Sequence, residues 1–62
     1  MTISKIYEMK LINDDTEIMV RDSEFHVLAQ GNWYQDNVLD YRNSELESFT
    51  WQDDNKIFID LK

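Results

Sequence analysis

The chain has 62 residues with no Cys or Pro, one Gly and one His, and its 13 Asp and Glu against 6 Lys and Arg give a formal net charge of -7. Thiol nucleophiles, zinc sites, phosphate-binding glycine loops and Ser-His-Asp triads need Cys, His and Gly in numbers that this chain lacks. Its negative charge also repels nucleic acids and anionic lipids. We therefore expect no enzyme, no cofactor or metal, and no direct binding to nucleic acid or membranes.

The length allows one small domain, residues 1–62, because a domain of this size buries only ~60% of the surface of its unfolded chain. Since no disulfide or metal can reinforce so small a core, a homodimer is a fair expectation. The N-terminus has no long apolar run of the kind that a signal peptide or membrane helix needs. The sequence therefore predicts a soluble, cytoplasmic protein.

The first dozen residues fit either a helix or a strand. A helix with Thr2 as N-cap would have one apolar stripe, formed by Ile3, Ile6, Tyr7 and Leu11. A strand would align a different set on one face, namely Ile3, Tyr7, Met9 and Leu11. We favour the helix.

Two short segments after this helix predict a hairpin. In residues 17–21, apolar and polar side chains alternate as in a half-buried strand. Residues 22–24 are turn formers, and the second strand, residues 25–29, has an inward face made of Phe25, Val27 and Ala29. The only glycine, Gly31, predicts a bulge, a bend or a positive φ at the end of this strand.

The remaining residues predict one helical turn and a second hairpin. The helical turn covers residues 37–41, with Asn37 as N-cap. The hairpin joins residues 45–51 to residues 56–61 through Asp53-Asp54-Asn55. Three apolar residues of its first strand, Leu46, Phe49 and Trp51, can share one face only if a bulge lies near Glu47 and Ser48.

Together these elements predict an α+β fold, with an N-terminal helix packed on a four-stranded, mainly antiparallel sheet. A small all-β roll is the alternative if the first segment is a strand.

The order of these elements along the chain resembles that of a known group of proteins. The order begins with an amphipathic helix, the segment Asp15-Thr16-Glu17-Ile18-Met19-Val20-Arg21-Asp22, and a Gly that closes the second strand. Leu46-Glu47-Ser48-Phe49 then precedes an Asp-Asp turn and an Ile-x-Ile-x-Leu ending. Over most of its length the chain thereby resembles small uncharacterised proteins of Gram-positive phages and conjugative elements. The resemblance implies a mobile-element protein and brings no catalytic residues.

The clustered acids do not form a recognisable metal or catalytic motif. Neither Asp14-Asp15-x-Glu17 nor Asp53-Asp54-Asn55 is followed by the sixth-position Gly of a calcium loop, so we interpret both as turns. Glu45 and Glu47 would lie ~6.7 Å apart on one face of a strand, but so small a core rarely shapes the pocket that raises a catalytic pKa. The single His26 is predicted at the surface.

The acids are concentrated in two stretches. Residues 13–24 sum to -4, from five acids and Arg21, and residues 36–54 sum to -5, from six acids and Arg42. Such a field favours a basic partner. The aromatics Trp33, Tyr34, Trp51 and Phe58 fit core packing, which we favour for the group, or a binding interface, and Phe58 is the one expected to be most exposed.

We therefore predict a non-enzymatic interaction protein that binds another protein with a basic surface. The predicted interface consists of Trp33, Tyr34, Asp36, Asp40, Glu45, Glu47, Asp53, Asp54 and Phe58. If the mobile-element resemblance holds, these carboxylates would imitate nucleic-acid phosphates and inhibit a nucleic-acid-handling protein, as anti-CRISPR proteins do. The alternatives are a structural homo-oligomer that pairs through an edge strand or the Phe58 face, and an uncharacterised small domain without an inhibitor role.

Overall fold

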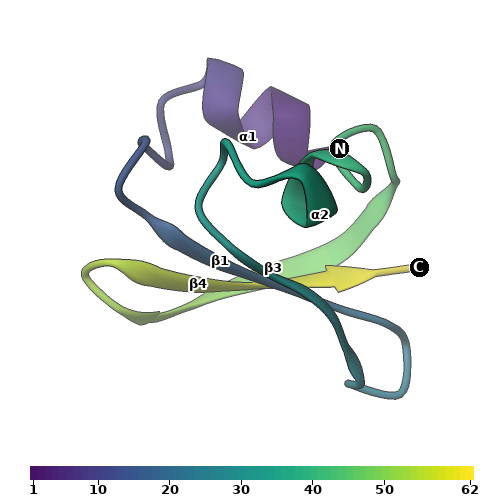
Figure 1. Ribbon diagram of the computed structural model, residues 1–62. Helices are drawn as coiled ribbons and strands as arrows, with labels where there is room; N and C mark the ends of the chain where they lie inside the picture. Colours follow the sequence, from purple (N-terminus) through teal and green to yellow (C-terminus); the bar gives the residue numbers. More distant parts are fainter.

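A four-stranded sheet with two short helices on one of its faces makes up the protein, as seen in a computed structural model that describes residues 1–62 (Figure 1). The elements in chain order are α1 (Ile3–Glu8), β1 (Glu17–Arg21), β2 (Val27–Gly31), α2 (Asp36–Leu39), β3 (Leu46–Asp53) and β4 (Lys56–Leu61). The predicted α+β fold and the packing of a helix on a sheet are confirmed.

The sheet is mixed, with strand order β2-β1-β4-β3. The pairs β1–β2 and β3–β4 are the two antiparallel hairpins that the sequence predicts. The central pair, β1–β4, is parallel and aligns Ile18 with Ile57 and Val20 with Ile59. The expectation of a mainly antiparallel sheet is therefore only partly met, because the strands that join the hairpins run in the same direction.

Helix α1 begins as the sequence predicts and ends earlier. The Thr2 hydroxyl accepts a hydrogen bond from the Lys5 backbone N–H at 3.2 Å, which caps the first turn. The helix stops at Glu8, and the chain reverses at Lys10, whose φ is 63°. The prediction that Leu11 lies on the buried stripe is wrong, since the reversal exposes Leu11 and buries Ile12 instead.

The turn between β1 and β2 is longer than predicted. The Asp22 carboxylate accepts backbone hydrogen bonds from Glu24 at 2.8 Å and His26 at 2.9 Å, which forms a compact loop. Phe25 lies in this loop with a φ of 66° and is exposed, so its predicted place on the inward face is wrong. Val27 is exposed as well, and of the three predicted inward residues only Ala29 is buried.

Two further local predictions concern Gly31 and the second helix. Gly31 has a φ of 147°, as its position after a strand suggested, and a Cβ there would collide with the Gln35 side chain. Helix α2 starts at Asp36 with Gln35 as its N-cap. Asn37 is therefore not the cap, and its side chain donates to the Gln30 carbonyl at 3.3 Å.

The bulge predicted in β3 is present. Leu46 pairs with Leu61, yet Ser48 pairs with Asp60, so one extra residue is accommodated at Glu47. This shift allows Leu46, Phe49 and Trp51 to face the same side as the inward residues of β4.

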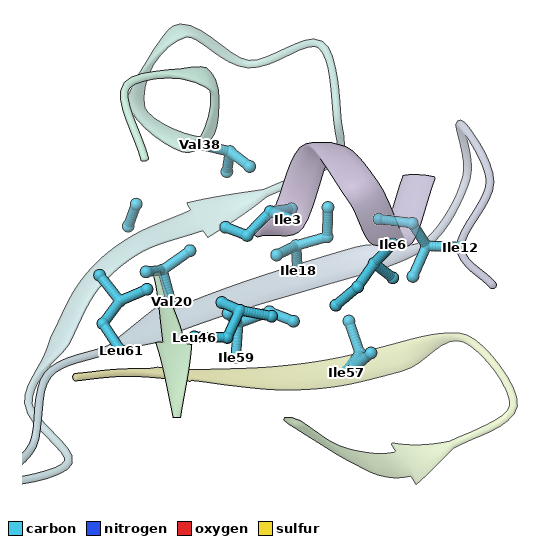
Figure 2. Close-up of a cluster of buried hydrophobic side chains, with 11 residues drawn as sticks. Ile3, Ile6, Ile12, Ile18, Val20, Val38, Leu46, Ile57, Ile59 and Leu61 are labelled. Carbon is cyan, nitrogen blue, oxygen red and sulfur yellow. The ribbon is translucent and has the colours of Figure 1, made fainter. Parts of the chain in front are cut away.

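The core lies between the helices and the sheet. Figure 2 shows Ile3 and Ile6 of α1 and Val38 of α2 pointing toward Ile18 and Ile59 of the central strands. The full cluster contains Ile3, Ile6, Ile12, Ile18, Val20, Ala29, Val38, Leu46, Ile57, Ile59 and Leu61. No buried side-chain nitrogen or oxygen lacks a hydrogen-bond partner. The opposite face of the sheet carries no helix.

Candidate functional site

The predicted aromatic residues are not all available for binding. Trp33 stacks on Tyr7, with ring centroids 4.4 Å apart and planes at 9°, and packs against the core. Phe58 is half-buried, because the Arg21 guanidinium lies over its ring at 4.4 Å. Tyr34 and Trp51 are exposed. Of the four predicted aromatics, Tyr34 and Trp51 are therefore the ones that a partner can contact.

Most of the predicted acids stand in water without a basic neighbour. Among the six acids of residues 36–54, only Glu45 forms an ion pair, at 2.7 Å to the N-terminal amine. Hydrogen bonding from this amine lowers the pKa of Glu45. The other five acids are exposed and unpaired, namely Asp36, Asp40, Glu47, Asp53 and Asp54.

The fold does not gather these acids into one patch. Glu47 and Asp53 lie near opposite ends of β3, which at about 3.3 Å per residue separates them by roughly 20 Å. Asp36 and Asp40 lie at the two ends of α2, on the helical side of the sheet. Asp53 and Asp54 are adjacent at the turn between β3 and β4. A single partner contact therefore cannot use all of them equally.

One hollow brings free carboxylates and exposed apolar side chains together. It has a volume of about 490 Å³ and is lined by Leu11, Trp51, Asp53 and Asp54, and we call it the Trp51 hollow. Trp51 pairs with Ile57 and therefore faces the helical side, while a register shift between Trp51 and Asp53 alters the strand just before the turn. The exposed Leu11, which lies outside α1 because the chain reverses early, also lines the hollow.

No base forms an ion pair with the carboxylates of the Trp51 hollow. Lys56 pairs with Asp53 in the backbone register, but its ammonium binds Glu17 at 3.2 Å. Gln30 also donates to the Glu17 carboxylate at 2.9 Å, and this hydrogen bond is the main reason why the pKa of Glu17 is lowered. The Asp53 carboxylate accepts only the Asn55 backbone N–H, at 2.8 Å, and Asp54 accepts no hydrogen bond.

The two other hollows use most of their carboxylates in internal contacts. In a hollow of about 400 Å³, Asp60 is bound to Arg21 at 2.8 Å and Asp22 accepts the loop N–H groups. In a hollow of about 440 Å³, the Tyr7 hydroxyl donates to Asp14 at 2.6 Å, which raises the pKa of Tyr7, and Lys10 contributes a positive charge. Each of these two hollows keeps one unpaired acid, Glu47 in the first and Glu8 in the second, whereas the Trp51 hollow has two.

Leu11 and Trp51 are not part of the predicted interface. A sequence signal existed for Trp51, since it stands two residues before the Asp53-Asp54 pair. No sequence signal marks Leu11, because its exposure depends on where α1 ends.

The structure has no group of three or more His, Cys, Asp or Glu side chains placed to hold a metal ion. Neither helix has the length and apolar character that a membrane crossing requires. Comparison of the chain with protein-family models, with curated proteins and with solved structures gave no match.

Proposed function

We propose that the protein is a non-enzymatic interaction protein that binds a basic surface of another protein, and that the Trp51 hollow receives a Lys or Arg side chain of that partner. The observation that carries this proposal is the meeting of exposed apolar walls with two unneutralised carboxylates. A Lys or Arg side chain has a long apolar stem and a cationic head. The stem packs on Leu11 and Trp51, and the head meets Asp53 and Asp54.

Several physical effects favour such a ligand. Trp is the best aromatic partner of a cation, and the net charge of -7 attracts basic surfaces over distances up to about a Debye length. Each exposed charge pair contributes about 0.2–1 kcal/mol. Two carboxylates and a Trp ring therefore give on the order of 1–2 kcal/mol, which is about 5- to 30-fold in affinity.

A role as a nucleic-acid mimic is a more specific form of this proposal. It draws on the resemblance to proteins of phages and conjugative elements, and on the five exposed, unpaired acids of residues 36–54. Carboxylates that occupy a basic groove exclude the phosphates that the groove normally binds. In this form the partner is a nucleic-acid-binding protein, and a DNA duplex competes with this chain for it.

The test of the Trp51 hollow is a titration of a fluorescently labelled hexa-arginine peptide, followed by anisotropy. Asp53→Asn combined with Asp54→Asn removes two charges from the hollow, whereas Asp36→Asn combined with Asp40→Asn removes two exposed charges at the ends of α2. Since the Trp ring remains, we expect the first pair to weaken binding by about 3- to 10-fold and the second by less than about 3-fold. Trp51→Leu should weaken binding as well, without any change in charge.

Equal losses from the two pairs of substitutions would show that only net charge matters and would overturn the assignment to the hollow. The proposal also requires that wild-type binding fall steeply as NaCl rises from about 0.1 to 1 M, because screening shortens the Debye length from ~10 to ~3 Å. Binding that persists unchanged at high salt would contradict it.

A further inference from the structure

The outer edge of β2 is unpaired. β2 stands at one end of the strand order and bonds only to β1. The backbone of residues 27–29 makes no hydrogen bond outside the β1–β2 ladder, while at the end of the strand Asn37 covers the Gln30 carbonyl. An edge of this kind presents N–H and C=O groups that another strand can pair with.

The usual protection of sheet edges is absent from β2 and present at the other edge. Residues 25–35 contain no Asp, Glu, Lys or Arg, although the chain as a whole is 31% charged. The edge strand β3 carries Glu47 and Asp53, and its first residue, Leu46, is bonded through its N–H to the Met1 carbonyl at 2.8 Å. Charged side chains and additional backbone pairing prevent other strands from pairing with an edge. The edge of β3 is therefore protected against strand pairing, and the edge of β2 is not.

Apolar side chains accompany the open edge. Phe25, Val27 and Leu28 are all exposed, and Phe25 is the most exposed of the large apolar side chains at 64%. The φ of Phe25 is 66°, a left-handed conformation that is uncommon and strained for a bulky residue. Its N–H donates to the Asp22 carbonyl at 3.0 Å, so the loop holds the ring in this position. The fold thus maintains a strained, exposed aromatic ring beside an unpaired strand.

We propose that a second copy of this chain pairs along β2, antiparallel to it, and joins the two sheets into one continuous sheet. The charge distribution selects this occupant. Two copies, each with a net charge of -7, repel one another over most of their surface, and β2 lies in the uncharged stretch where they can approach. A basic partner finds no acidic side chain on β2 itself with which to form an ion pair.

The symmetry of the contact follows from pairing a strand with its own copy. An antiparallel pair of identical strands closes about a two-fold axis and leaves no repeating contact that would build a filament. With the axis near Leu28, the two Leu28 side chains meet, and Phe25 of each copy lies opposite Gly31 of the other, beside the Gln35 side chain that packs over this glycine.

The contact is small, which sets the strength of the dimer. A standard stable interface buries about 800 Å² on each partner, which is about a fifth of the 3978 Å² surface of this chain. A five-residue strand and one aromatic ring provide less than that. We therefore expect dissociation constants in the micromolar range or weaker, and a concentration series from about 10 µM to 1 mM is required.

The test is sedimentation equilibrium of the full chain with two Lys substitutions at matched exposure. Leu28 is 41% exposed at the β2 edge, and Met9 is 47% exposed after α1, outside both the edge and the Trp51 hollow. We expect wild type and Met9→Lys to dimerise with the same affinity and Leu28→Lys to dimerise at least about tenfold more weakly, since edge charges oppose strand pairing. Because no cysteine is present, Leu28→Cys should also form a disulfide-linked dimer on mild oxidation, and Met9→Cys should not.

The dependence on salt separates this contact from the binding of a basic partner. Raising NaCl from about 0.1 to 1 M screens the repulsion between the two acidic copies and should strengthen the dimer, whereas it weakens binding at the Trp51 hollow. A wild-type chain that stays monomeric over the whole concentration range would overturn the inference. Equal effects of Leu28→Lys and Met9→Lys would overturn it as well.

Discussion

The ion pair between Arg21 and Asp60 provides a strong quantitative test, because it joins β1 to β4 across the parallel pairing that the sequence did not predict. The guanidinium Nε lies 2.8 Å from Asp60 Oδ1, and Nη2 lies 3.1 Å from Oδ2. The two side chains are 21% and 12% exposed, respectively. The guanidinium also lies over the rings of Phe58 at 4.4 Å and Phe25 at 4.9 Å.

The expected magnitude lies between those of exposed and buried pairs. Exposed pairs contribute about 0.2–1 kcal/mol, and removal of one partner from a buried pair costs about 3–5 kcal/mol. Two hydrogen bonds hold this pair in one geometry, but Arg21 still reaches water. We therefore expect Asp60→Ala and Arg21→Ala each to lower the free energy of unfolding by about 2–3 kcal/mol, with a coupling energy of about 1–2 kcal/mol.

The assay is a double-mutant cycle of the two single variants and the combined variant, with the free energy of unfolding measured in urea. The combined variant should be more stable than the sum of the two single losses predicts, since the second substitution no longer leaves an unpaired charge. Additivity to within about 0.5 kcal/mol would show that the two side chains do not interact and would refute this description of the parallel pair.

Two further predictions concern the hydrophobic core and the dependence of stability on acidic pH. Ile59 is fully buried, so Ile59→Val should lower the free energy of unfolding by about 0.5–1.5 kcal/mol, which calorimetry should record as a fall in Tm of roughly 4–8 °C per kcal/mol. Val27→Ala at the exposed edge is the control and should change the free energy of unfolding by less than about 0.5 kcal/mol. Equal effects would contradict the assigned core. The pKa of Glu45 is lower in the folded protein than in the unfolded chain, because the N-terminal amine donates a hydrogen bond to it. This bond therefore stabilises the fold at pH values above the unfolded pKa of about 4.3, and the stabilisation is lost as the pH falls through the folded pKa. The Tm advantage of wild type over Glu45→Gln should therefore shrink between pH 6 and about 3, and a constant difference would refute the assignment.

Local signals in the sequence predicted the parts of the fold that depend on neighbouring residues. The Thr2 cap, the positive φ of Gly31 and the bulge at Glu47 follow from side-chain chemistry or from the spacing of apolar residues. The parallel pairing of β1 with β4 depends on contacts between residues about forty positions apart, which alternation alone does not encode. Phe25 was misplaced because a bulky aromatic is an unusual residue for a left-handed turn position.

The candidate site was predictable in its charge and not in its shape. Asp53 and Asp54 were identified from the acidic stretch, and both are exposed as an acidic interface requires. The stacking of Trp33 on Tyr7 is a contact between α1 and the turn before α2, so the sequence around Trp33 gave no sign of it. Leu11 joined the Trp51 hollow only because α1 ends early.

The most direct test of the Trp51 hollow is a two-dimensional ¹⁵N NMR titration of the full chain with unlabelled hexa-arginine peptide at low salt. We predict that the largest shifts fall on the Trp51 indole N–H and on the backbone N–H groups of Leu11, Asp53 and Asp54. The backbone N–H groups of Asp36 and Asp40 should shift less, although these side chains are exposed as well. Shifts spread evenly over all acidic segments, or a Trp51 indole signal that does not move, would contradict a binding site at this hollow.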